Sequence, residues 1–163
     1  NIYDIIISTY FYNRFRVNDN LKNISLNYYA LNIFNFDKFV KLTNMFSLSL
    51  RKSAKYKIYS YEEMRKNPKK CFRNIIKLGG FKIDEAAFEE ALKRTSFKSM
   101  QKNEMNDLGI RKKANLHVRK GKVYGFKDYL SESTVNTISE NLKDKLDPLL
   151  RDYYVHLPKS FNR

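Results

Sequence analysis

The stretch KYKIYSYEEMRKNPKKCFRNIIKLGG, residues 55–80, carries most of what the sequence says about the fold. Its first part, 55–61, is rich in tyrosine and isoleucine and predicts a short strand. Pro68 suits the first position of a helix, and Gly79 follows the last apolar residue of that helix and predicts its end. Cys71 falls on the apolar side of this helix, where a buried packing position is favoured over a reactive thiol. Together with the segments around it, the stretch indicates a mixed α/β fold with more helix than strand.

Three further helices are predicted on either side of it, from start signals and from apolar residues at helical spacing. They cover residues 36–50, 84–94 and 131–146, and Pro148 disturbs or ends the last one. An apolar stripe in the first of these helices is expected to face the core. Its members are Phe36, Phe39, Val40, Thr43, Phe46 and Leu50.

The remaining segments carry weaker signals. Residues 4–12, DIIISTYFY, are β-branched and aromatic, so propensity alone predicts a strand. Residues 13–27 and 101–118 are polar and poorly patterned, so both are expected to be loops.

Composition excludes several classes of protein. The 163 residues contain 42% hydrophobic and 15% aromatic side chains, which is too many for a globally disordered chain. A single cysteine excludes a disulfide framework and a cysteine-based zinc site, and two histidines exclude a histidine-rich metal site. No stretch approaches the roughly 20 apolar residues that cross a membrane. The net charge of +15 calls for an anionic partner.

The segment RKGKVYGFK, residues 119–127, combines cations with two glycines. Glycine lets a backbone N–H approach an oxyanion closely, and arginine binds phosphate through two hydrogen bonds. The segment therefore has the chemistry of a phosphate cradle, although for RKG alone a solvated basic turn is the favoured interpretation. No Walker motif, GxxxxGK[ST], occurs in the chain.

Two other segments offer groups that suit a nucleobase. Tyr61 follows the predicted strand, where its ring or hydroxyl can reach a ligand, or can pack against the next helix. Phe97 and Met100 offer a flat, polarisable surface after the helix 84–94, and Thr95 and Ser96 offer hydrogen bonds. An ordinary transition from helix to loop is the alternative interpretation there.

The order of these segments is more specific than any one of them. YEEM, then NP, a helix ending in Leu78-Gly79-Gly80, an acidic short helix, TSFKSM and RKGK resemble the C-terminal half of a cytosolic sulfotransferase. The resemblance covers roughly residues 1–146 and is strongest over 56–130. It implies a P-loop-like α/β fold, a parallel sheet flanked by helices, that is helix-rich in this segment. It also implies a helix over 4–12, and we prefer that to the strand.

The resemblance also assigns a donor site for 3′-phosphoadenosine 5′-phosphosulfate (PAPS), with no metal. Ser8 and Arg119 match residues that bind the 3′-phosphate, and Lys120 and Gly121 match the loop beside it. The residues that match the adenine side are Tyr61, Thr95, Ser96, Phe97 and Met100. The implied acceptor is a small alcohol, phenol or amine, and the implied location is cytoplasmic.

The sequence departs from the family pattern in three places. Tyr124 occupies a position where the family has glycine, so a left-handed backbone there is strained unless Gly125 takes its place. The segment after Lys127 matches the usual dimerisation segment poorly, with Asn136 in place of an acid. The family's phosphosulfate loop, catalytic lysine and general-base histidine have no match. We therefore expect residues 1–163 to be a single partial domain, the C-terminal half without the N-terminal half, and to be inactive alone.

Two alternatives remain at this stage. A basic module that binds nucleic acid would use the +15 charge and the aromatic residues, but no helix-turn-helix, zinc-finger or RRM signature occurs. A truncated, inert sulfotransferase-like protein is the other. Nucleic acid is the less favoured partner, and no membrane contact is expected.

Overall fold

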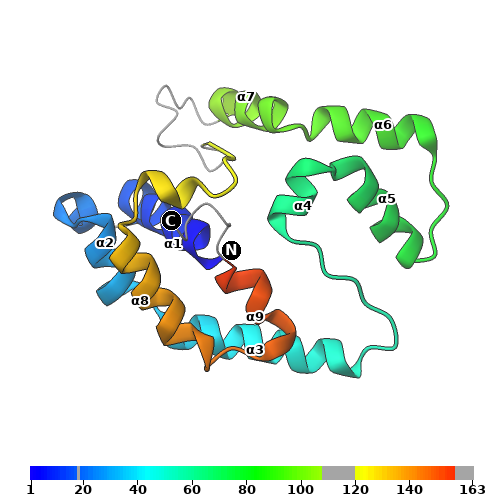
Figure 1. The fold of residues 1–163 in the computed structure, drawn as a ribbon. Coiled ribbons are helices and arrows are strands. Elements are labelled where there is room, and N and C mark those ends of the chain that lie inside the picture. The colour runs from blue at the N-terminus through cyan, green and yellow to red at the C-terminus, as the bar shows by residue number, and fades with distance from the viewer. Residues whose placement is uncertain (18, 108–119, 157–163) are drawn as a thin grey trace. The chain divides into compact units, whose positions relative to one another are not determined.

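The computed structural model describes residues 1–17, 19–107 and 120–156. Within these ranges the regular elements are all helices or helical turns (Figure 1). The chain divides into two compact units, which are described separately. Unit 1 comprises Asn1–Tyr10, Asp19–Ala54 and Tyr124–Arg163, and unit 2 comprises Phe11–Asn18 and Lys55–Val123.

Unit 1 contains the main hydrophobic core of the described residues. It contains α1 (Ile2–Tyr12) as far as Tyr10. Its other elements are η2 (Asp19–Asn23), α2 (Leu26–Tyr28), η3 (Tyr29–Ile33), α3 (Phe36–Lys52), η5 (Gly125–Asp128), α8 (Glu132–Lys143) and α9 (Pro148–Val155). Tyr3 and Ile6 of α1 and Ile138 of α8 are completely buried, and so is Phe126 of η5. The rings of Tyr3 and Phe126 lie 4.8 Å apart between centroids. Such burial of large apolar side chains is the principal stabilising contribution in this unit.

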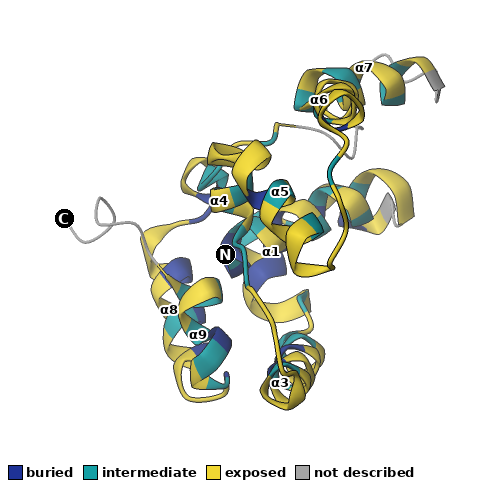
Figure 2. Ribbon diagram, turned by 90° about the vertical axis from the view of Figure 1, so that its right-hand side faces the viewer, coloured by how far each residue is buried: buried dark blue, intermediate teal, exposed yellow. Residues whose placement is uncertain are grey.

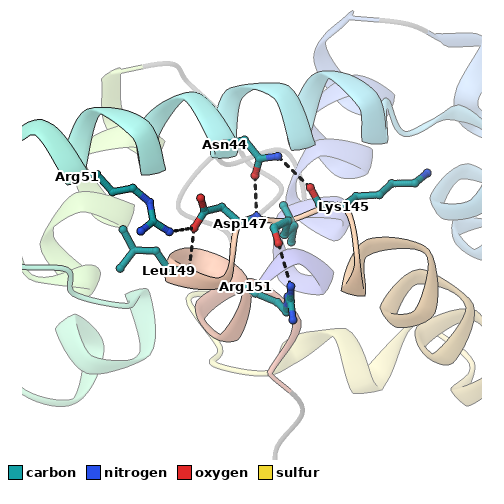
Figure 3. Close-up of polar contacts among 7 residues, drawn as sticks. Asn44, Arg51, Lys145, Asp147, Leu149 and Arg151 are labelled. Atoms are coloured by element: carbon teal, nitrogen blue, oxygen red, sulfur yellow. Dashed lines mark hydrogen bonds and ion pairs between the residues drawn. The ribbon is translucent and has the colours of Figure 1, made fainter.

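Hydrogen bonds made by Asn44 and Arg51 of α3 hold the start of α9 against α3, and we call this set of contacts the joint between α3 and α9 (Figure 3). The Asn44 side chain donates to the Lys145 carbonyl at 2.9 Å and accepts from the Asp147 N–H at 2.9 Å. Asp147 caps α9 by accepting from the Leu149 N–H at 2.8 Å, and it pairs with Arg51 at 2.7 Å. The predicted helix 131–146 ends earlier, at Lys143, and Pro148 opens a new helix at the first helical position, where proline is tolerated.

Unit 2 has far less core than unit 1. Its elements are η1 (Asn13–Val17), α4 (Tyr61–Lys66), α5 (Pro68–Leu78), α6 (Glu85–Arg94) and α7 (Phe97–Asp107). Among its described residues, only Cys71 and Phe88 are buried apolar side chains, and most of α5 and α6 is exposed (Figure 2). Arg73 pairs with Glu85 through two hydrogen bonds and lies 4.9 Å from the Phe88 ring centroid, and Lys69 pairs with Glu89. Charged contacts thus supply much of the link between α5 and α6.

Four predicted helices are confirmed, as α1, α5, α6 and α8. Asp84 and Ser131 cap α6 and α8 with their side chains, while Pro68 opens α5 and Gly79 closes it. The packing role of Cys71 is also confirmed. The apolar positions predicted for 131–146, including Val135 and Leu146, are buried.

The helix predicted at 36–50 is present as α3, but its orientation was only partly predicted. Thr43 is buried as expected, whereas Phe46 has 63% of its surface exposed. Ser47, which is not in the stripe, is fully buried. The face of α3 that packs inward is therefore rotated toward its polar residues, because the joint to α9 is made by Asn44 and Arg51.

Propensity was wrong at 4–12, where α1 forms as the family resemblance implies. Burial of Ile2, Tyr3, Ile6, Ile7 and Tyr10 on one side of a helix outweighs the β propensity of the same residues. The strand predicted at 55–61 is also wrong. Residues 56–60 are non-helical, Tyr61 opens α4, and no partner strand occurs within the described ranges. A strand needs such a partner for its ladder of hydrogen bonds.

Both predicted loops were partly wrong. Residues 13–27 form helical turns for much of their length, in η1, η2 and the start of α2. Residues 101–107 belong to α7, and the rest of the predicted loop, 108–118, lies outside the described residues.

Candidate nucleotide-binding site

The predicted adenine side begins where α4 starts. Ser60 and Glu63 form a reciprocal cap, in which the Glu63 N–H donates to Ser60 Oγ at 3.1 Å and the Ser60 N–H donates to Glu63 Oε2 at 2.8 Å. This capping box fixes the chain direction at the first helical residue, Tyr61. Half of the Tyr61 surface is exposed, so its ring is open to a ligand.

The junction of α6 and α7 presents two hydroxyl groups with defined roles. Thr95 Oγ1 donates to the Ala91 carbonyl at 2.7 Å, so toward a ligand it can only accept. Ser96 Oγ accepts from the Ser99 N–H at 3.3 Å and lies 2.9 Å from Ser99 Oγ. An acceptor at Thr95 suits an amino group, such as the exocyclic amine of adenine.

Phe97 and Gly121 are brought into direct contact, although 23 residues separate them in the sequence. A Cβ placed on Gly121 would lie 2.3 Å from Phe97 Cε2 and 2.6 Å from Phe97 Cδ2, so the ring rests directly on the glycine backbone. Gly121 has φ +57°, in the left-handed region that favours glycine. The predicted adenine segment and the predicted phosphate loop therefore meet at one point in unit 2.

Arg65, a residue that the sequence analysis did not single out, lies over the same ring. Its Cζ is 5.0 Å from the Phe97 ring centroid, within the range of a cation–π interaction. In the sequence Arg65 looks like an ordinary cation in the last turn of α4. Only the YEEM motif, which places it four residues after Tyr61, hints that it lies near the site.

The remaining predicted residues are not all gathered at this contact. Met100 lies one turn beyond Phe97 on α7 and is partly exposed, and Lys120 is exposed beside Gly121. Arg119 lies outside the described residues, as does His117. Ser8 is exposed on α1 and belongs to unit 1.

The turn that follows the phosphate loop is anchored in unit 1. The Phe126 N–H donates to Asp4 Oδ1 at 2.8 Å, and Asn1 bonds the other oxygen of the same carboxylate at 3.0 Å. Tyr124 has φ 55°, so the left-handed backbone foreseen at the family's glycine position is held by tyrosine itself. Gly125 does not take over that conformation. Asp4 was missed because in sequence it only opens the apolar stretch 4–12.

The groups gathered at this site can pack against a planar base and bind an anion. The site combines an aromatic ring, hydroxyl acceptors, a guanidinium and a glycine-bearing basic turn. Within the described residues, no cluster of three or more histidine, cysteine, aspartate or glutamate side chains could hold a metal ion. None of the described helices is long and apolar enough to cross a membrane.

A comparison with protein families decides the identity of the chain. The family model described as the sulfotransferase domain matches residues 1–149. The chain belongs to the sulfotransferase family. Membership of the sulfotransferase family, at the level of the domain, is thus confirmed, and the match includes every residue of the candidate site. No curated protein and no solved structure matches this sulfotransferase chain.

Proposed function

We propose that this sulfotransferase chain serves a PAPS-dependent enzyme and supplies the adenine and 3′-phosphate side of its donor site. The contact of Phe97 with Gly121 is the observation that carries the proposal. It brings the aromatic ring of the predicted adenine side against a glycine of the basic loop, as a nucleotide with a phosphate near its base requires. The proposal includes a P-loop-like α/β fold for the whole domain and a cytoplasmic location.

Sulfuryl transfer is a displacement at sulfur. A hydroxyl or amine of a small acceptor attacks the sulfur, its S–O or S–N bond forms, and 3′,5′-adenosine bisphosphate leaves with the electrons of the broken S–O bond. Catalysis of such transfers depends on positioning, charge stabilisation and a base, as in phosphoryl transfer. Here Tyr61 and Phe97 would position the adenine, while Ser8, Arg119 and Lys120 would hold the 3′-phosphate.

We further propose that this chain binds donor without turning it over. The phosphosulfate loop, the catalytic lysine and the general-base histidine of the family pattern have no match in these 163 residues. Measurable sulfuryl transfer by the isolated chain would contradict this part of the proposal. An inert, truncated family member is distinguished by its failure to bind the nucleotide at all.

Calorimetric titration of the whole chain with 3′,5′-adenosine bisphosphate tests the proposal. We expect binding, and we expect Arg119→Ala and Lys120→Ala each to weaken it about tenfold, as loss of a charge-assisted hydrogen bond does. The control is Lys82→Ala, which removes an exposed cation of unit 2 outside the site. A parallel titration with a single-stranded oligonucleotide tests the other candidate. If the chain prefers the oligonucleotide, with a steep salt dependence, it is a nucleic-acid module instead.

A further inference from the structure

Arg65 holds a position that the proposed donor site leaves unexplained. It lies in the last turn of α4, its side chain is exposed, and its Cζ is 5.0 Å from the centroid of the Phe97 ring. The Phe97 ring itself is only partly exposed, and its Cδ2, Cε2 and Cζ atoms lie within 3.0 Å of where a Cβ on Gly121 would be. A planar ligand approaching this ring from the side of α4 therefore meets the guanidinium first.

We propose that Arg65 is a further nucleotide-binding residue, on whose guanidinium the adenine base stacks, with Phe97 as the supporting layer beneath. This inference rests on the proposed function and names one more residue of the same site. A guanidinium is planar and weakly hydrated, so one face can lie on an aromatic ring while the other accepts a nucleobase. Gly121 helps to hold the Phe97 ring in place, because its missing side chain is what allows the ring to lie so close to the backbone.

The charge of Arg65 adds to this stacking. The nucleotide carries phosphates at both its 3′ and 5′ positions, so a fixed cation at the base end attracts the whole ligand. Lysine at the same position would keep the charge but lose the planar surface. The two contributions can therefore be separated by substitution.

The test uses the whole chain, two ligands and three variants. The ligands are 3′,5′-adenosine bisphosphate and its abasic analogue, 1-deoxyribose 3,5-bisphosphate. The variants are Arg65→Ala, Arg65→Lys and, as a matched control, Lys66→Ala, which removes a neighbouring exposed cation from the same helix turn. Because Arg65 is exposed, each variant should fold, and thermal melting checks that it does.

Arg65→Ala should lower the affinity for the adenosine bisphosphate about tenfold. It should change the affinity for the abasic analogue about twofold or less, because stacking acts only on the base. Arg65→Lys should recover only the small part of the loss that charge explains. Lys66→Ala should leave the affinities for both ligands within about twofold of the wild type. Equal losses for both ligands, or equal effects of Arg65→Ala and Lys66→Ala, would overturn the inference and leave the proposed function standing. If the wild-type chain binds neither ligand, the proposed function itself fails and the inference fails with it.

Discussion

At the scale of single residues, adding one methyl group at Gly121 is expected to reduce the affinity for the donor nucleotide. Gly121→Ala places a Cβ 2.3 Å from Phe97 Cε2, too close for any real contact, and at φ +57° it also strains the backbone. The ring must move off the loop, so we expect the affinity for 3′,5′-adenosine bisphosphate to fall about tenfold or more. Calorimetry measures the affinity, and a thermal melt measures the accompanying loss of stability.

Gly80 provides the matched control for that substitution. It also has a left-handed backbone, at φ +77°, but a Cβ there meets nothing within 4 Å. Gly80→Ala should therefore cost only the backbone strain, about 1 kcal/mol, and leave the bisphosphate affinity unchanged. Equal losses of affinity in the two variants would show that the Phe97 contact is irrelevant to binding.

Tyr124 presents the opposite case, a bulky residue where the backbone favours glycine. At φ 55° it carries a left-handed strain of about 1–2 kcal/mol, which its ring partly offsets by an edge contact with Phe126 at 6.4 Å between centroids. Tyr124→Ala removes the contact and keeps the strain, whereas Tyr124→Gly removes both. We expect the glycine variant to be the more stable of the two by about 1 kcal/mol, measured by urea unfolding. An alanine variant as stable as the glycine variant would show that φ at position 124 is relaxed in solution.

At the scale of elements, the joint between α3 and α9 should make unit 1 sensitive to acid. The hydrogen bond from Arg51, and then the bond from the Leu149 N–H, hold the pKa of Asp147 below its usual range. A lowered pKa means that the folded state binds the proton more weakly than the unfolded state, whose aspartate pKa is about 3.9. The stabilisation is therefore present above that value and is lost as the pH falls through the lowered pKa.

Asp147→Asn tests this dependence. The variant should melt at a lower temperature than the wild type at pH 7, and its melting temperature should fall less on acidification below about pH 4. Asp144→Asn is the control, since it removes an exposed carboxylate three residues away. Parallel melting curves for the wild type and Asp147→Asn across that range would contradict the proposed role of the joint.

The elements also show what sequence can and cannot predict here. Helix α5 was predicted because Pro68 and Gly79 mark both of its ends. Helix α8 was predicted because Val135, Ile138 and Leu142 recur three and four residues apart, as on one face of a helix. Residues 55–61 were mispredicted because strand propensity says nothing about a pairing partner, which is a long-range property. The α7 helix was missed over 101–107 because its residues are polar, although Ser96 caps its start.

The residues of the candidate site could likewise be predicted from the sequence only in part. Phe97 and Gly121 were predicted from motif order, yet their contact could not be, because it joins residues far apart in sequence. Arg65 was missed for the related reason that a cation at a helix end is usually solvated. Arg65 differs from other surface cations only because, in the folded chain, its guanidinium lies over the Phe97 ring.

At the scale of the whole molecule, apolar burial and charge are distributed in opposite ways. Almost all the buried apolar residues of the described ranges lie in unit 1, whereas unit 2 has Cys71 and Phe88. Unit 2 holds 21 of the 32 lysines and arginines and eight of the 17 acids, a net charge of +13. Unit 1 holds the other 11 cations and nine acids, a net charge of +2. The basic character of the chain thus belongs to the unit that contains the Phe97–Gly121 contact, and there it opposes folding unless an anion is bound.

This concentration of charge predicts how donor binding responds to salt. A field from +13 charges attracts 3′,5′-adenosine bisphosphate over distances that salt screens, with a Debye length of about 10 Å at 0.1 M. Raising sodium chloride from about 0.05 to 0.5 M should therefore lower the bisphosphate affinity measured by calorimetry severalfold. Uncharged adenosine should bind weakly and with little salt dependence. The bisphosphate should also raise the melting temperature at low salt more than at high salt, because binding relieves repulsion within unit 2. A bisphosphate affinity that is independent of salt would mean that the excess charge of unit 2 has no part in donor binding.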